Sequence, residues 1–355
     1  MADGVRQLEY VYLTILPLGA RRCTGRATST TNIIMSALNS TGLNCSVAPT
    51  RAPSDAGIAG AGILLAFIIT AALALLLSSY IVISEAFMAS SPRTISRKLL
   101  SSLSDQQIVE GIAIQALGIA RINSMVAYHF FIIWMLSLLS TATNFAALLA
   151  LVQDFKRDWV LRWLRQAAMF VNLCLTIVFG VFVLEVNWKS LPSTLPVGCV
   201  WVDHVKESAD KGNTSLSVAG TIAVIAASSI VFVLGTWYLH LRKQVWGRIV
   251  RVASLLVLFA IAIAATARVV IISQAFGFPD VPLSDEGEKI WSFGQLLAML
   301  MLILPFISAL EIARGELQVP SYEMGRVDAD EVPLTSSMEE GGKKRYTYQA
   351  NPFFR

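Results

Sequence analysis

Polar side chains inside apolar segments are the residues of this sequence whose types and spacing could support chemistry. The densest group runs from Asp105 to Gln115. Gln107 and Glu110 within it are three residues apart and therefore share one face of a helix. A carboxyl group in apolar surroundings can stay protonated near neutral pH and act as an acid. Glu110 is therefore a candidate general acid, with Asp105 and Gln107 as candidate substrate-binding residues.

The beginning of this group also has a purely structural interpretation. Ser104 followed by Gln107 forms the pattern of a capping box, in which the serine hydroxyl caps the first turn of a helix. Asp105 would then complement the positive end of the helix dipole. Glu110 lies deeper in the segment, and capping does not explain it.

Five further polar residues border or interrupt other apolar segments. His129 and Glu185 are candidate catalytic residues, and Asn144, Arg268 and Gln295 are candidate substrate-binding residues, because ionisable groups at membrane depth commonly serve function. Structural alternatives exist for three of them. His129 could pack through a hydrogen bond, Glu185 could be solvated at a helix end, and Arg268 could extend to the interface or pair with Glu185.

Several classes of catalytic and cofactor site are missing from the sequence. There is no Walker A loop, no GxSxG elbow, no HExxH motif and no Asp-rich run suited to a magnesium diphosphate. The chain has only three histidines, so we expect no metal and no cofactor. Any chemistry must rely on carboxylates, histidine and amides.

The composition predicts the elements that position these residues. Hydrophobic residues make up 55% of the chain, charged residues 15%, and mean hydropathy is +0.62. A net charge of +4, distributed over short loops, does not suggest nucleic-acid binding. The apolar residues cluster in segments of the length that crosses a bilayer. We predict an all-α polytopic membrane protein, a bundle of seven transmembrane helices, at about 57–84, 108–122, 125–152, 167–186, 216–241, 252–276 and 290–312.

Loop charge and glycosylation motifs predict the orientation of this bundle. The connections after spans one, three and five hold most of the loop Lys and Arg, which places them in the cytosol. The glycosylation sequons fall on the opposite side, at Asn39, Asn44 and Asn213. We therefore expect residues 1–56 to form a lumenal tail, residues 313–355 to form a disordered cytosolic tail, and the protein to reside in the endoplasmic reticulum.

Three of the four cysteines lie in the predicted lumenal segments. Cys23, Cys45 and Cys199 are placed in an oxidising compartment, so one disulfide is expected, with its pairing open. Cys174 falls inside an apolar segment and is expected to pack there.

Three stretches resemble a large fungal family of seven- or eight-span proteins: residues 103–115 with an LSDQQ core, residues 128–130 (YHF), and residues 291–295 (WSFGQ). The members with known activity are similar to membrane-bound terpene cyclases of the ascofuranone/ascochlorin type. The family pattern has Thr at the position of Glu110. The resemblance implies metal-free cyclisation of a farnesylated aromatic, a meroterpenoid precursor, or of its epoxide.

Such a reaction sets requirements that the sequence can meet. A prenylated substrate can reach an intramembrane site directly from the lipids, and pathway enzymes are possible partners. The carbocation needs a dry cavity with aromatic walls. Candidates for these walls are Phe130, Phe131, Trp134, Phe179 and Phe182.

Two other classes of membrane protein share some of these features. A seven-helix receptor or sensor would have the same orientation, although no DRY-like element or NPxxY motif is present. A transporter is disfavoured because no internal repeat is found.

Overall fold

The computed structural model describes residues 45, 48–85, 94–157, 159–189, 191–201, 214–240, 247–279 and 281–318, and within them there are helices and no strand. The chain divides into two compact units, residues 1–313 and 314–355. Of the second unit, only residues 314–318 are described, and they are helical. The sequons at Asn39, Asn44 and Asn213, Cys23 and most of the predicted tails lie outside the described residues.

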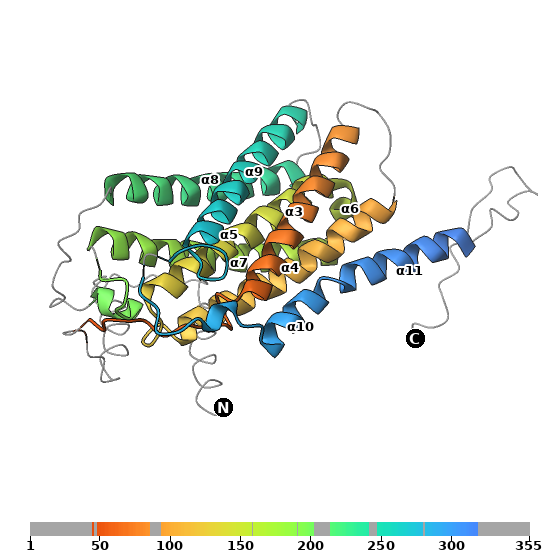
Figure 1. Ribbon diagram of the computed structural model, residues 1–355. Helices are drawn as coiled ribbons and strands as arrows, with labels where there is room; N and C mark the ends of the chain where they lie inside the picture. Colours follow the sequence, from red (N-terminus) through yellow and green to blue (C-terminus); the bar gives the residue numbers. More distant parts are fainter. Residues whose placement is uncertain are drawn as a thin grey trace, which may run out of the picture. The chain divides into compact units, whose positions relative to one another are not determined.

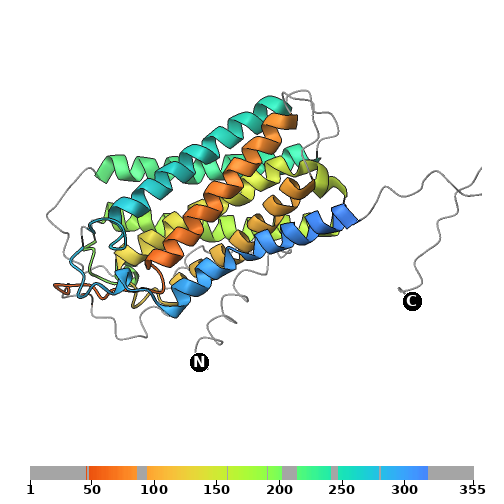
Figure 2. The ribbon, with the colours of Figure 1, turned by 45° about the vertical axis from the view of Figure 1, so that its right-hand side comes forward.

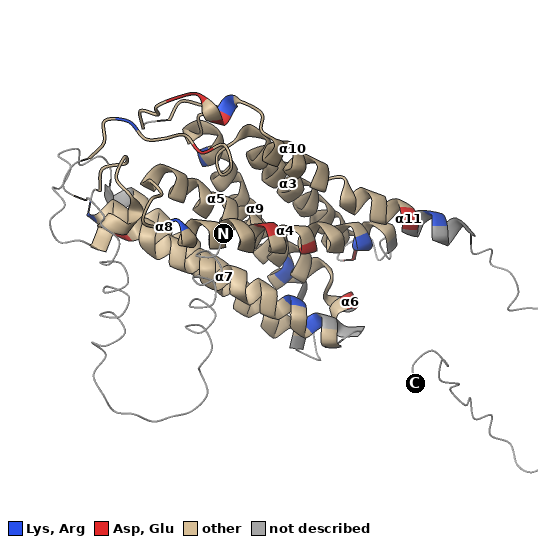
Figure 3. Cartoon of the chain, turned by 90° about the horizontal axis from the view of Figure 1, so that it is seen from below, with Lys and Arg blue, Asp and Glu red and all other residues tan. Residues whose placement is uncertain are grey.

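Six segments are long and apolar enough to cross a membrane, as expected of an integral membrane protein. Five of them are single helices, α3 (Ala61–Ile83), α5 (Ala127–Ala150), α7 (Trp159–Trp188), α8 (Thr214–His240) and α9 (Gly247–Ile272). The sixth, Gly287–Glu311, contains α10 (Phe293–Met301) and most of α11 (Leu304–Gln318). Among the described helices, charged residues are concentrated towards the ends, with α4 as an exception (Figure 3).

The sixth segment is broken near its proline. α10 and α11 follow one another in nearly the same direction (Figure 2). Pro305 lies in the first turn of α11, where a missing backbone N–H has no intrahelical acceptor to lose. Pro305 therefore lies just after an interruption between two helices, where it interrupts no helical hydrogen bond.

α4 (Thr94–Ala120) occupies the place of the predicted second span but is not counted among the six apolar segments. It begins well before Ser104, so the prediction that Ser104 caps a helix was wrong. The preceding residues favour helix because Leu100 and Leu103 are buried in the core. The Ser104 hydroxyl instead donates to Asn144 Oδ1 at 3.1 Å.

α5 forms the centre of the bundle. It packs against α3, α4, α7, α8 and α9 (Figure 1), and the whole of its apolar segment is buried. A helix that is apolar on all sides is stable only where other helices surround it. The first turn of α5 is thereby fixed relative to most of the other helices.

A ring of hydrogen bonds holds α4 against α5 and α7. Gln115 on α4 donates to Asn172 Oδ1 on α7 at 2.8 Å, and Asn172 donates to Thr141 Oγ1 on α5 at 3.1 Å. The Thr176 hydroxyl on α7 donates to Gln115 Oε1 at 3.3 Å. All four side chains are buried, so their polar groups are satisfied within the protein.

The basic segment 153–166 interleaves Lys and Arg with two Trp residues, a mixture that predicts a short helix lying on the headgroups. The structure contains a short helix α6 (Val152–Arg157), and Trp159–Gln166 instead forms the first turns of α7. Arg165 pairs with Asp105 on α4, and its guanidinium also lies over the ring of Phe155. Part of the predicted interfacial segment therefore belongs to a long helix.

Candidate functional site

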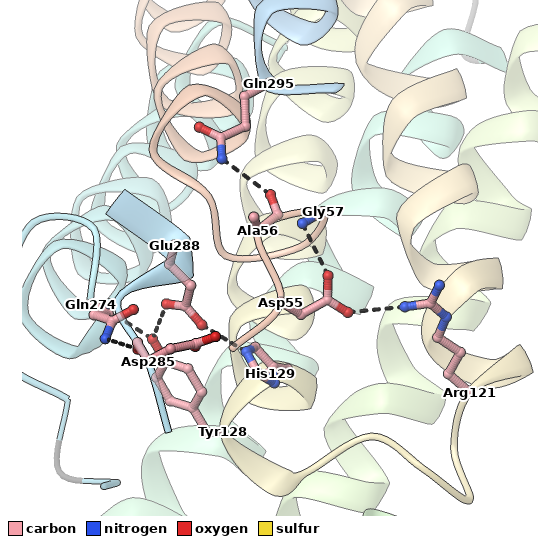
Figure 4. Close-up of polar contacts among 10 residues, drawn as sticks. All are labelled: Asp55, Ala56, Gly57, Arg121, Tyr128, His129, Gln274, Asp285, Glu288 and Gln295. Carbon is pink, nitrogen blue, oxygen red and sulfur yellow. Dashed lines mark hydrogen bonds and ion pairs between the residues drawn. The ribbon is translucent and has the colours of Figure 1, made fainter. Parts of the chain in front are cut away.

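Two consecutive residues at the start of α5 bind one buried carboxylate (Figure 4). His129 Nε2 lies 2.8 Å from Glu288 Oε1, and the Tyr128 hydroxyl donates to Glu288 Oε2 at 2.9 Å. Glu288 is fully buried, although it belongs to a short 3-10 turn, η3 (Gly287–Lys289), in the connection between α9 and α10. Because a buried charge is tolerated only with partners, this arrangement fixes all three side chains.

The cluster continues towards the end of α9. The backbone N–H of Gln274 donates to the Tyr128 hydroxyl oxygen at 3.0 Å. The Gln274 amide donates to the carbonyl of Asp285 at 2.8 Å, which ties the connection carrying Glu288 to the helix end. Tyr128 thus both donates and accepts, and its hydroxyl is held on Glu288.

An open recess of about 190 Å³ lies beside His129. It is lined by residues 53–55 before α3, by Arg121 and residues 124–126 between α4 and α5, and by His129. Arg121 Nη1 and Asp55 Oδ2 form an ion pair at 2.9 Å across this lining. A ligand in the recess would therefore contact one member of the His129–Glu288 pair directly.

The connections around the recess are joined to one another by backbone hydrogen bonds. Ala52 N donates to the carbonyl of Pro282 at 2.9 Å, and Ser284 N donates to the carbonyl of Ala52 at 2.8 Å. This short bridge holds the 53–55 wall of the recess against the connection that carries Glu288. The recess wall and the position of Glu288 consequently both depend on the contact between Ala52 and residues 282–284.

Gln295, a predicted substrate-binding residue, reinforces this junction. Its Nε2 donates to the carbonyls of Ile290 at 3.0 Å and Ala56 at 3.4 Å, and its Oε1 accepts from Gly62 N at 3.1 Å. The side chain is fully buried, and a Cβ on Gly60 or Gly62 would overlap with it. Gln295 therefore joins segments of the protein in this structure, and all of its polar contacts are internal.

A disulfide links two more segments at the same end of the bundle. Cys45 is bonded to Cys199, which resolves the pairing that the sequence left open. Cys199 belongs to the 3-10 turn η2 (Val197–Trp201), whose Gly198 N–H donates to the carbonyl of Ile122 at 3.0 Å. The disulfide thus ties Cys45 to η2, and η2 is bonded in turn to the connection between α4 and α5, part of which lines the recess.

The remaining acidic candidates lie apart from this cluster. Glu110 accepts a hydrogen bond from Gln106 at 2.7 Å within α4, and its other carboxyl oxygen is buried with no partner among the described residues. Glu185 lies 3.9 Å from Lys189 on its own helix. The structure brings neither Glu110 nor Glu185 together with His129.

Three predicted binding residues are likewise engaged elsewhere. Gln107 donates to the carbonyl of Phe67 at 3.4 Å, and Asn144 accepts from Ser104 and donates to Ser140. Arg268 is exposed on α9 and forms no ion pair with a described residue, so the predicted pairing with Glu185 is not found. α7 and α9 lie on different sides of α8, which explains why these two residues do not meet.

The aromatic residues expected to line a cavity pack against one another instead. The rings of Phe130 and Phe179 stack with centroids 4.2 Å apart, and Phe182 lies 5.6 Å from Phe130. Phe131 and Trp134 form a further pair at 5.8 Å. These rings form part of the core or pack against it in this structure, and an aromatic cavity at this place stays a prediction.

Glu288 and Asp55 carry the site, but the sequence had not identified them as candidates. Both lie in polar connections where carboxylates are normally solvated, and only tertiary contacts bury Glu288. His129 was predicted as a catalytic candidate, and Tyr128 was noted only as part of residues 128–130. No group of three potential metal ligands occurs within the described part of the chain.

The arrangement can carry out proton transfer. With Nε2 of His129 bonded to Glu288, Nδ1 forms no hydrogen bond to a described residue and is left for a ligand, and general acid–base catalysis by histidine uses such an arrangement. This is the chemistry of a histidine oriented by a carboxylate. Comparison of the chain with protein-family models, with curated proteins and with solved structures finds no match in any of the three.

Proposed function

We propose that this protein is a membrane-bound terpene cyclase that acts on a farnesylated aromatic compound, or on its epoxide, by acid-initiated carbocation cyclisation. The observation that carries the proposal is the His129–Glu288 pair at the edge of an open recess. The resemblance of residues 103–115, 128–130 and 291–295 to a cyclase-containing family supports the choice of reaction.

In this proposal the aromatic head of the substrate occupies the recess. A volume near 190 Å³ suits a single ring, since a cavity of about 150 Å³ can hold benzene. The phenol oxygen closes onto the carbocation and releases its proton to His129 Nδ1. Glu288 stabilises the imidazolium that results, and Tyr128 keeps the carboxylate in place.

Glu110 is suited to deliver the initiating proton. It precedes Arg121, the residue that directly follows the end of α4, by 11 positions, which in helical geometry is about three turns and about 16 Å along one face. The extended twelve-carbon backbone of a farnesyl group spans a similar length, about 15 Å at roughly 1.3 Å per bond. The carboxyl of Glu110 protonates the epoxide oxygen or the terminal olefin, and His129 takes up the proton lost on ring closure. The reaction is therefore an isomerisation without net loss of protons.

The proposed orientation places the recess in the lumen of the endoplasmic reticulum. The Cys45–Cys199 disulfide supports this assignment because disulfides persist in oxidising compartments. Endoglycosidase treatment of the full chain from microsomes tests it. Loss of Asn39, Asn44 and Asn213 together should abolish a mobility shift, and the lack of any shift in the wild type would contradict a lumenal location.

The cyclase activity is tested with microsomes that contain the full chain and are fed farnesylated phenols and their epoxides. Cyclised products are quantified by mass spectrometry. Glu110→Gln removes the proposed acid, and Glu288→Gln removes the partner of the proposed base His129, so each should reduce turnover by about 100-fold or more, the usual contribution of a general acid or base. Glu185→Gln is the matched control and should retain activity. Full turnover in both test variants, or none in the wild type, would refute the proposal.

A further inference from the structure

The hydrogen-bond donors of the recess are not all used within the protein. Both oxygens of Asp55 have partners, since Oδ1 accepts from Gly57 N at 3.0 Å and Oδ2 accepts from Arg121 Nη1 at 2.9 Å. The Arg121 guanidinium forms no other hydrogen bond to a described residue, and its side chain is 52% exposed. Its Nε–Nη2 edge is therefore left with two parallel N–H donors.

This free edge has the geometry that recognises a carboxylate. A guanidinium presents its N–H groups in a planar fork, and bidentate pairs with carboxylates are both strong and directional. Asp55 holds the opposite edge of the same guanidinium, so the donor fork is oriented before a ligand arrives (Figure 4). A preoriented donor loses less side-chain entropy when the ligand binds.

The recess is less suited to a cationic ligand. An amine would need an acceptor carboxylate, but the charge of Asp55 is already balanced by Arg121, whose Nη1 lies 2.9 Å from Asp55 Oδ2. Glu288 is fully buried behind His129 and Tyr128. Of the residues that line the recess, Arg121 carries charged N–H donors that no described residue uses. The balance of free groups therefore favours an anion.

We infer that the recess binds the carboxylate of an aromatic acid, with Arg121 as the specificity-determining residue. That the ligand carries a prenyl chain rests on the proposed function, whereas its carboxylate is inferred from the free donors of the recess. Met125 and Val126 provide apolar contact for one ring, and the recess volume limits the head group to about one ring. The substrate class is thus a prenylated hydroxybenzoic acid rather than a neutral phenol.

The test compares a farnesylated dihydroxybenzoic acid with its methyl ester, which has the same ring but no negative charge. Binding to the full chain purified in detergent is measured by calorimetry. The wild type should bind the acid about tenfold or more tightly than the ester, as expected for a charge-assisted bidentate contact. Arg121→Gln should remove this difference because it should lower the affinity for the acid and leave the affinity for the ester unchanged. Lys98→Gln removes an exposed positive charge near the beginning of α4, and this control should leave both affinities unchanged.

Each outcome separates this inference from the cyclase proposal. The carboxylate site would be overturned if the wild type bound acid and ester with equal affinity. It would also be overturned if Arg121→Gln lowered both affinities by the same factor. Cyclisation of the ester as fast as the acid would also overturn it and leave the cyclase intact. Arg121-dependent binding of the acid without any cyclised product would support the site and refute the cyclase. Asp55→Asn provides a second variant. It should lower the affinity for the acid because Arg121 loses the ion pair that orients its guanidinium.

Discussion

Glu288 lies 159 residues after His129 in the sequence, and the two side chains meet at 2.8 Å between Oε1 and Nε2 with both residues buried. One belongs to a polar connection and the other to the most buried helix of the bundle. The contact therefore joins the turn before α10 to the centre of the protein, and it does so beside the recess.

Loss of the Glu288 carboxylate should lower the free energy of unfolding by an amount that depends on the residue that replaces it. Glu288→Ala leaves Tyr128 and His129 without their partner and should cost about 3 to 5 kcal/mol of unfolding free energy. Glu288→Gln retains hydrogen-bonding groups and should cost about 1 to 2 kcal/mol. Thermal unfolding of the purified full chain measures both. Glu286→Ala serves as the control because Glu286 is 74% exposed, and equal effects at positions 286 and 288 would contradict the buried pair.

A methyl group at Gly62 should disturb the junction made by Gln295. The added Cβ would lie 2.7 Å from Gln295 Cβ and 2.8 Å from its backbone oxygen, neither of which can move freely. We expect Gly62→Ala to cost about 1 to 3 kcal/mol, as overpacking does in other proteins. Gly220→Ala is a matched control, since no atom lies within 4 Å of its Cβ position on α8. That control should leave the melting temperature unchanged or raise it.

The opposite end of the bundle is held by Glu85, which pairs with Arg97 of α4 and, at 2.8 Å, with Arg251 of α9. Glu85→Ala leaves two largely buried arginines without this carboxylate and should cost about 2 kcal/mol. Asp154→Ala removes a more exposed partner of the same Arg97 and should cost less than about 1 kcal/mol. Chemical denaturation compares the two variants. A larger loss of stability in Asp154→Ala than in Glu85→Ala would contradict the larger contribution expected of the buried pairing.

The Cys45–Cys199 disulfide should stabilise the segments around the recess as a unit. Cys45→Ala and Cys199→Ala should each lower stability by about 2 to 4 kcal/mol, and the double variant should be no worse than either single one. Alkylation of the unfolded chain should detect one additional free thiol in each single variant. Cys174→Ala, a free cysteine on α7, provides the control. Additive losses in the double variant would argue against the bond.

The sequence predicts the long apolar helices well because a bilayer-length apolar segment has few alternatives. α3, α5, α8 and α9 lie within a few residues of the predicted ranges 57–84, 125–152, 216–241 and 252–276. The prediction was weakest for α4, whose beginning is polar. Its first turns are fixed by burial of Leu100 and by the pairing of Arg97, and no local pattern in the sequence reports such contacts.

The candidate site was predicted only in part, for a related physical reason. His129 was identified because an ionisable group in an apolar segment stands out. Glu288 lies in a connection rich in acidic residues, where its burial depends on the fold of three separate segments. Gln295 was identified for its polarity, but only the structure shows that its amide binds backbone groups of the protein.

The hydrogen-bonded ring of Gln115, Asn172, Thr141 and Thr176 has a consequence for how the protein is made. α4 emerges from the ribosome before α5 and α7, which carry the other members of the ring. Until they arrive, its amide and charged groups face a costly transfer from water into lipid. α4 would therefore wait at the membrane surface or within the translocon and insert together with its later neighbours. We therefore expect α4 to enter the membrane together with α5 and α7 rather than before them.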